Sequence, residues 1–217
     1  IEDAALLLEV IGGADDFDST ASSKSIEEYS KVKFDDKPKR IAYIKECLES
    51  KSLDAEIKQL IEDKIAKLKE EGHAVEPISF PYLDYLVPTY YVITTAEASS
   101  NLARFDGVHY GYRSENITDL ESTYINSRTE GFGEEVKRRI MLGTFVLSAG
   151  YYDAYFTKAQ KIRRLIQDKT NKMFKDYDFV ISPTTPHTPF EIGTKHTDPT
   201  VMYLEDIFTV QANLTGN

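Results

Sequence analysis

Residues 130–166 read EGFGEEVKRRIMLGTFVLSAGYYDAYFTKAQKIRRLI. This pattern predicts a helix, a tight break at residues 148–150 and a second helix. The first helix should have an apolar face, because four residues recur at helical spacing: Val136, Ile140, Gly143 and Leu147. The second helix opens with aromatic residues that we expect to form an inner stripe: Tyr151, Tyr152, Tyr155 and Phe156. Its basic end suits the helix dipole.

Three basic residues lie in the opening turns of the first helix: Lys137, Arg138 and Arg139. Cations in that place lie near the positive end of the helix dipole, which is unfavourable for helix stability. We therefore expect at least one of them to pair with an acidic ligand or with a buried carboxylate. A solvated run of surface charge is the alternative that the sequence leaves open.

The sequence before this helix pair predicts a βαβ unit. Residues 39–44 form a short β run, residues 53–71 repeat apolar side chains at intervals of three and four, and residues 73–80 form a second strand. Two strands joined by a helix of this length favour parallel pairing. With a further strand at residues 178–183, the fold class is α/β, a mixed and mainly parallel sheet covered by helices.

We expect one partial domain over residues 1–217. It would comprise an entry helix and polar connection over residues 1–38, the βαβ unit over 39–80, and a helical wall over 81–217 that carries the strand near 178–183. The first residue is not Met, and the last residues show no closing element, so the sequence has the appearance of a piece of a longer protein.

Four further segments of the helical wall carry expectations. Residues 81–90 predict a turn-rich link. Residues 89–104 predict a helix whose small side chains allow close backbone packing, so we expect it to be deeply buried. Residues 117–130 predict a polar, mobile segment. Residues 202–214 predict a final helix with Asp206 near its start.

Composition limits the class of protein. The chain has 217 residues, 41% of them hydrophobic, which supports a core of real size. The net charge of -10 argues against nucleic-acid binding driven by overall charge. Cys47 is the single cysteine, so no internal disulfide can form, which fits a reducing, cytoplasmic location. No apolar run approaches the ~20 residues of a membrane span.

The sequence lacks the common motifs of nucleotide, metal and serine-hydrolase chemistry, namely the phosphate loop, the dinucleotide glycine fingerprint, CxxC, HExxH and GxSxG. Two groups of potential ligands lack the spacing of a metal site: Asp15, Asp16 and Asp18, and His187, His196 and Asp198. We therefore expect no metal and no cofactor in this chain. The basic run between residues 158 and 175 could contact RNA or a partner, but a solvated helix face is favoured.

Several segments are distinctive as a set: residues 97–107, 110–113, 131–166, 182–186, 192–193, and 212–214 with Gly216. Together they resemble the A subunits of glutamyl-tRNA(Gln) amidotransferases, a branch of the amidase signature family. The resemblance covers nearly the whole chain and is weakest over residues 21–37. It implies that the family's catalytic lysine and two serines lie before Ile1, so that this chain alone is inactive.

The resemblance also implies three residues that bind free glutamine: Tyr90, Arg139 and Asp206. The chemistry agrees, because an arginine can hold an α-carboxylate through two parallel hydrogen bonds and an aspartate can pair with an α-ammonium group. Arg138 is a rival to Arg139, and only one can face a ligand, since adjacent helix positions point about 100° apart. A buried ion pair between Arg139 and Asp206, without any ligand, remains an alternative.

The resemblance implies a role for the complete protein within a complex, in which it would work with subunits B and C. The complete protein would hydrolyse glutamine through an acyl-enzyme and pass ammonia to a partner. That partner would use ATP and magnesium to convert Glu-tRNA(Gln) into Gln-tRNA(Gln). The alternatives are another amidase acting on a different small amide, and a non-catalytic binding module.

Overall fold

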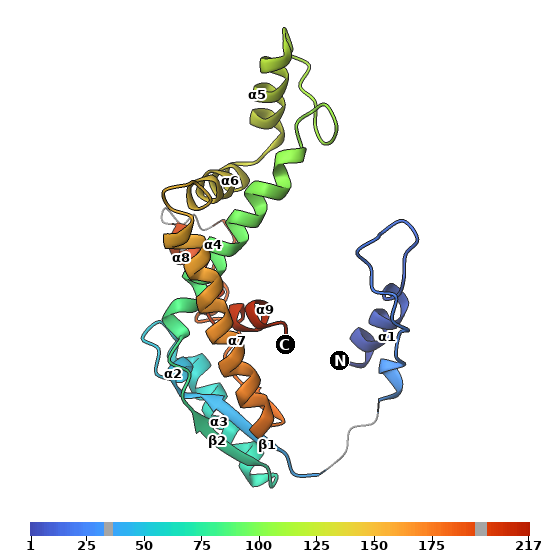
Figure 1. Cartoon of the computed structure of the whole chain (residues 1–217). Helices are drawn as coiled ribbons and strands as arrows, with labels where there is room; N and C mark the ends of the chain where they lie inside the picture. Colours follow the sequence, from blue (N-terminus) through green and yellow to red (C-terminus); the bar gives the residue numbers. More distant parts are fainter. Residues whose placement is uncertain (33–36, 194–198) are drawn as a thin grey trace. The chain divides into compact units, whose positions relative to one another are not determined.

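The computed structural model describes residues 1–32, 37–193 and 199–217. The chain divides into two compact units, Ile1–Pro38 and Lys39–Asn217. The first contains helix α1 (Glu2–Ile11) and the short 3-10 helix η1 (Tyr29–Lys31) (Figure 1). The predicted opening helix is therefore confirmed. A hydrogen bond from the Ser30 backbone N–H to the Glu9 carboxylate, 2.6 Å long, ties η1 to α1.

The second unit is built on a three-stranded parallel sheet in the order β2-β1-β3. The strands are β1 (Arg40–Ile44), β2 (Ala74–Ile78) and β3 (Phe179–Ile181). After the short α2 (Lys45–Leu48), the helix α3 (Ala55–Glu70) leads to β2. These elements confirm the βαβ unit and the α/β fold class that the sequence predicts.

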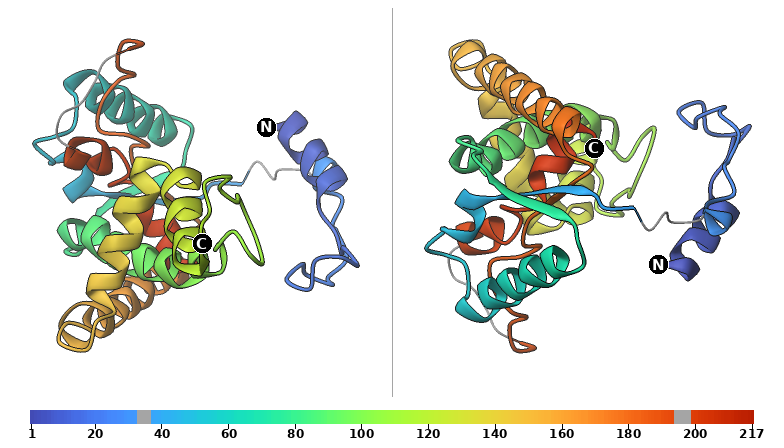
Figure 2. Two further views of the ribbon diagram at one scale, coloured as in Figure 1. Left: turned by 90° about the horizontal axis from the view of Figure 1, so that it is seen from above. Right: turned by 90° about the horizontal axis from the view of Figure 1, so that it is seen from below.

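Helices cover both faces of this sheet (Figure 2). Side chains alternate along a strand, so Ile41 and Ile44 of β1 belong to two separate buried clusters. Ile41 packs with Ile65 of α3, whereas Ile44 packs with Ile166 of the long helix α7 (Lys158–Asp176). Cys47 belongs to the cluster of Ile44 and Ile166 and is buried, with 2% of its surface exposed.

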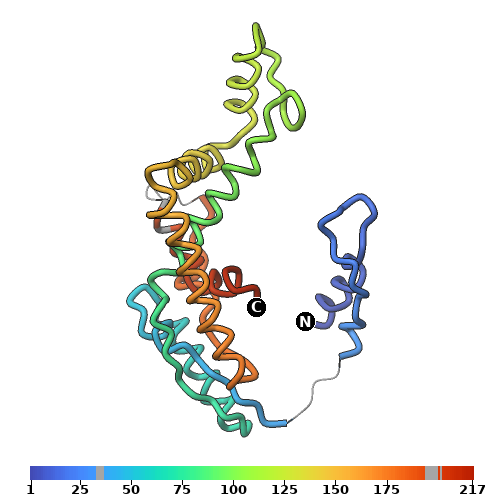
Figure 3. The backbone as a smooth tube through the Cα atoms, in the orientation of Figure 1, coloured from blue at the N-terminus to red at the C-terminus, as the bar shows by residue number. Residues whose placement is uncertain are grey.

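The remaining elements of the helical wall, all drawn in Figure 3, are α4 (Leu83–Asn101), η2 (Leu102–Arg104), α5 (Leu120–Gly131), α6 (Glu134–Val146), the π-helical turn η3 (Asp153–Thr157), α8 (Pro199–Leu204) and α9 (Val210–Thr215). The helix α4 packs against α6, α7 and α9. Within the described residues, none of the helices has the length and apolarity needed to cross a bilayer.

The expected turn-rich link at residues 81–90 is wrong, because α4 already begins at Leu83. Leu83, Leu86 and Thr89 are all buried and recur every three residues, so the apolar face of the helix extends through this segment. Pro88 lies inside the helix and removes one backbone hydrogen bond there. The burial of its neighbours outweighs that loss.

The expected polar, mobile segment at residues 117–130 is instead the helix α5. Asp119 and Ser122 form a capping box at its start. The Asp119 carboxylate accepts from the Ser122 backbone N–H at 2.7 Å, and the Ser122 hydroxyl accepts from the Asp119 backbone N–H at 2.9 Å. Thr123 and Ser127 are buried on its inner face. The capping pair is the local signal that fixes this helix.

The expected single final helix at residues 202–214 is also wrong, because the structure has two short helices, α8 and α9. Phe208 and Val210 are 5% and 1% exposed, respectively. Residues two apart on an α-helix differ by about 200° in direction, and the turn at residues 205–209 allows both side chains to join the same buried cluster. Asp206 accordingly lies in the turn between the helices, where its carbonyl accepts from the Thr209 and Val210 backbone N–H groups at 3.0 Å.

The predicted helix, break and helix at residues 130–166 are confirmed, with the π-helical turn η3 as an addition. The inner aromatic stripe is wrong, since Tyr151 and Tyr155 are 46% and 42% exposed. The buried face of α7 is formed by Ala159, Ile166, Thr170 and Met173. The exposed rings stack on one another instead, with Phe145 and Tyr151 centroids 4.4 Å apart.

Candidate functional site

The helices α4 and α6 cross with their backbones in close contact. A Cβ atom added at Gly143 would lie 2.0 Å from the carbonyl oxygen of Thr95, so only glycine fits there. The hydroxyls of Ser99 and Thr144 are hydrogen-bonded across the same crossing at 3.0 Å. The prediction that small residues of α4 allow close packing is therefore confirmed. The expected deep burial of residues 89–104 is wrong, because only Thr89, Thr95 and Ala96 among them are buried.

This crossing brings Arg139 of α6 against Tyr91 of α4. Residues four apart on a helix lie on one face, and Arg139 precedes Gly143 by four residues just as Tyr91 precedes Thr95. The guanidinium carbon of Arg139 lies 5.3 Å from the centre of the Tyr91 ring, which is a cation–π distance.

Tyr91 lies between two other tyrosines. The ring of Tyr90 meets it edge-on, with the centroids 5.2 Å apart, and the ring of Tyr203 from α8 packs on it at 4.3 Å. Burial raises the pKa of the Tyr91 phenol, the charge of Arg139 lowers it, and the charge of Asp206 raises it again, with a net upward shift. Tyr91 is therefore neutral at physiological pH and within electrostatic reach of both charged residues that the resemblance assigned to glutamine.

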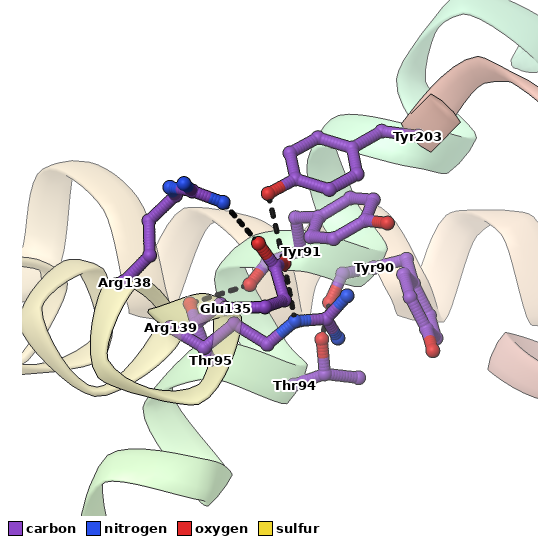
Figure 4. A network of polar contacts seen from close by, with 8 residues as sticks. All are labelled: Tyr90, Tyr91, Thr94, Thr95, Glu135, Arg138, Arg139 and Tyr203. Carbon is purple, nitrogen blue, oxygen red and sulfur yellow. Dashed lines mark hydrogen bonds and ion pairs between the residues drawn. The ribbon is translucent and has the colours of Figure 1, made fainter. Parts of the chain in front are cut away.

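Glu135 forms the polar contacts that join Arg138, Arg139 and Tyr203 (Figure 4). Together with Tyr90 and Tyr91, these residues are called the Arg139 cluster. Its Oε1 atom accepts from Arg139 Nε at 2.9 Å and from the Tyr203 hydroxyl at 2.9 Å, and its Oε2 atom accepts from Arg138. Burial alone would raise the pKa of Glu135, but the hydrogen bonds from Arg139 and Tyr203 and the arginine charge bring it below its ordinary value. We expected at least one of the basic residues to pair with an acidic ligand or a buried carboxylate. Arg138 and Arg139 both pair with Glu135, which is only partly buried.

The two adjacent arginines differ in environment. The side chain of Arg138 is 54% exposed and that of Arg139 is 34% exposed. Within the described residues, the bond from Nε to Glu135 is the sole hydrogen bond of Arg139. Figure 4 shows its two terminal nitrogens directed away from Glu135, toward the side on which Tyr90 and Thr94 lie. A guanidinium in this setting retains the pair of parallel donors that a carboxylate accepts.

Among the described residues, Arg139 and Asp206 do not form an ion pair with each other. In the described part of the chain Arg139 is paired with Glu135, and Asp206 is an exposed residue of the turn after α8. The alternative of a buried Arg139–Asp206 pair is therefore not what the structure contains. Tyr90 and Arg139 both lie around Tyr91, and Asp206 acts on the same ring through its charge.

Sequence reasoning missed Tyr91, Glu135 and Tyr203. Glu135 had a readable signal, because a glutamate four residues before an arginine forms a favourable helical pair. Tyr91 follows Tyr90 directly, which is a weak local signal. Tyr203 gave no local signal, since its contact with Glu135 spans 68 residues of sequence.

The described histidines have partners other than a metal or a serine. His187 contacts Glu205 at 2.7 Å, His109 contacts Asp106 at 2.8 Å, and His73 accepts from the Lys39 backbone N–H at 3.0 Å. His196 and Asp198 lie outside the described residues. No group of three metal-ligating side chains occurs in residues 1–32, 37–193 and 199–217.

A small cavity of about 120 Å³ lies at the carboxyl ends of β1 and β3, beside α7 and α9. Its lining includes Ile44, Val180, Ser182 and Gln211. None of the residues of the Arg139 cluster lines it. The edge of the sheet therefore has a pocket of its own, separate from the charged cluster.

Comparisons with known proteins agree with this architecture. The chain is 50% identical, over all 217 residues, to the A subunit of glutamyl-tRNA(Gln) amidotransferase from Clostridium botulinum strain Loch Maree, of which it covers 44%. It is 49% identical over 217 residues to the protein of the same name from Fusobacterium nucleatum, again over 44% of that protein. The chain thus spans less than half the length of these curated relatives.

Two solved structures share the fold. The crystal structure of the glutamyl-tRNA(Gln) amidotransferase A subunit from Thermotoga maritima has a TM-score of 0.70 and 39% identity, covering 99% of this chain and 42% of that one. A 6-aminohexanoate cyclic dimer hydrolase has a TM-score of 0.66 at 16% identity, covering 99% of this chain and 44% of that one, and shows the fold alone. The Amidase family profile matches residues 1–217. A match along every residue, on a parallel sheet covered by helices that solved relatives share, establishes that this chain belongs to the Amidase family.

Proposed function

We propose that the protein containing this chain is the A subunit of a glutamyl-tRNA(Gln) amidotransferase. It hydrolyses glutamine and delivers the ammonia to a partner protein. That partner uses ATP and magnesium to activate the glutamate of Glu-tRNA(Gln), which the ammonia converts into Gln-tRNA(Gln). Subunits B and C are the partners, and the complex works in the cytoplasm.

The observation that carries this proposal is the similarity of the whole chain to proteins of that name. Identity of 50% extends over all 217 residues, whereas the amide hydrolase with another substrate retains only 16%. The distinctive segments of the sequence, which include the Arg139 helix, lie within the matched region.

The geometry around Tyr91 supports a site for free glutamine. The terminal nitrogens of Arg139 take the α-carboxylate, and Asp206 pairs with the α-ammonium group. Tyr90 lies on the side toward which the guanidinium points and borders the bound amino acid. Amidases of neutral amides have no need of an arginine and an aspartate in this arrangement.

Replacing Arg139 tests the proposal. In the full-length protein with its partner subunits, Arg139→Ala should lower kcat/KM for glutamine by about 30-fold, the lower end of the 2–5 kcal/mol cost of losing a hydrogen-bonded charge partner, since the site is partly exposed. Formation of Gln-tRNA(Gln) from free ammonia should be unchanged, because ammonia needs no amino-acid pocket.

Lys137→Ala is the matched control, since it removes a neighbouring cation of α6 that is equally exposed and pairs with Glu134 rather than with Glu135. It should leave kcat/KM for glutamine within about threefold of the wild type. Equal losses with glutamine and with ammonia would indicate a folding defect in Arg139→Ala. Hydrolysis of other small amides by the wild type, in preference to glutamine and without partner subunits, would contradict the proposal itself.

A further inference from the structure

The turn after the short helix α8 carries Asp206. Tyr203 joins this segment to Tyr91 and Glu135, while Glu205 contacts His187 and Phe208 packs in the core. Tyr203 lies three residues before Asp206. Its ring packs on Tyr91 of α4, and its hydroxyl donates to Glu135 of α6 at 2.9 Å. A helix of six residues is too short to be stable without tertiary contacts. These two contacts therefore help to fix where the Asp206 turn lies.

One oxygen atom connects both halves of the site. Glu135 Oε1 accepts from Tyr203 and also from Arg139 Nε, each at 2.9 Å. The same atom thus orients the guanidinium of Arg139 and holds the segment that precedes Asp206. A change at either bond shifts one charged group relative to the other.

We infer that the Tyr203–Glu135 hydrogen bond is a positioning contact that sets the separation between Arg139 and Asp206, and so determines specificity for amides that carry a carboxylate and an ammonium on one carbon. This rests on the proposed function, because it assigns Arg139 and Asp206 to the two charges of glutamine. The two groups of an α-amino acid have a short, fixed separation. A site that binds both must hold its own charges to within a fraction of an ångström.

Tyr203→Phe in the full-length protein with its partner subunits removes the hydroxyl and keeps the ring. Ammonia release is measured with glutamine and with glutaric acid monoamide, which is glutamine without its amino group. For glutamine, kcat/KM should fall about tenfold, mainly through KM, because both charges must be met together. For the monoamide it should change less than about twofold, because that substrate uses Arg139 alone.

Glu135→Gln should give a different pattern. Arg139 then loses its charged partner, so kcat/KM should fall for glutamine and for the monoamide alike. Tyr85→Phe is the matched control, since Tyr85 lies on α4 with 52% of its surface exposed and should leave both substrates unaffected. Use of free ammonia for Gln-tRNA(Gln) formation should be normal in all three variants, which shows that the complex is intact.

The results separate the inference from the proposed function. Equal losses for both substrates in Tyr203→Phe, or no loss for glutamine, overturn the positioning role while leaving glutamine hydrolysis by the wild type in place. Sparing of the monoamide in Glu135→Gln overturns the role of Glu135 toward Arg139. A wild-type complex that releases no ammonia from glutamine refutes the proposed function, and the inference falls with it.

Discussion

Arg138 and Arg139 are adjacent in the sequence but differ in the residues that surround them. Both pair with Glu135, yet only Arg139 lies over the ring of Tyr91. The sequence indicated that cations near the start of α6 needed an acidic partner. It could not show that one carboxylate serves both, because that depends on side-chain conformations set by α4 and α8.

The lowered pKa of Glu135 predicts how the unfolding free energy changes with pH. A carboxyl group whose folded pKa lies below its unfolded value stabilises the protein above the unfolded pKa, and this contribution is lost as pH falls through the folded pKa. Glu135→Gln should therefore lower the unfolding free energy by a constant amount, at most about 1 kcal/mol for so exposed a group, between pH 6 and 8.

Below the ordinary glutamate pKa near 4.5 the difference between wild type and Glu135→Gln should shrink toward zero, because wild-type Glu135 becomes neutral as well. Urea titrations at several pH values measure this difference. A difference that grows on acidification would have the wrong sign and would contradict the assignment of Arg139 and Tyr203 as the partners that lower this pKa.

Among the secondary-structure elements, the crossing of α4 and α6 controls the site. Gly143→Ala would place a Cβ atom 2.0 Å from the Thr95 carbonyl, which is backbone and cannot rotate away. Alanine favours a helix by about 1 kcal/mol over glycine, but separating two packed helices costs about 1–3 kcal/mol. We expect a net loss of stability and a displaced Arg139, seen as a lower Tm and a weaker response to glutamine.

Gly150→Ala is the control for Gly143→Ala. Nothing lies within 4 Å of a Cβ atom at Gly150, so the substitution should leave Tm within about 1 °C. If the two variants have the same Tm, the crossing is looser than the structure describes. If Gly143→Ala lowers Tm but keeps a normal KM for glutamine, the crossing stabilises the fold without placing Arg139.

The elements that sequence could predict are those with strong periodic patterns. The spacing of apolar residues predicts the helix α3. It also predicts that residues 130–166 contain two helices, although the aromatic residues expected on the inner face of the second helix are exposed. The start of α4 lies between Pro81 and Pro88, two residues that are typical of turns, so its pattern resembles a loop. The family resemblance pointed to Arg139, whereas Tyr203 joins the candidate site only through tertiary contacts with α4 and α6.

At the scale of the whole molecule, the sheet of the second unit has two edge strands among the described residues. The strand β1 lies in the middle, and β2 and β3 each pair with it alone. An edge strand presents backbone N–H and C=O groups that can pair with another chain. Phe179 of β3 adds an apolar side chain that is 56% exposed.

The 217-residue chain expressed by itself should therefore self-associate through the edge at β3. Light scattering coupled to size-exclusion chromatography should give a mass above 24.7 kDa that rises with concentration. Phe179→Lys places a charge on the same edge and should return the mass toward that of a monomer, since lysine is a residue that protects sheet edges. A monomer at every concentration in the unmodified chain would show that this edge is already satisfied within the chain.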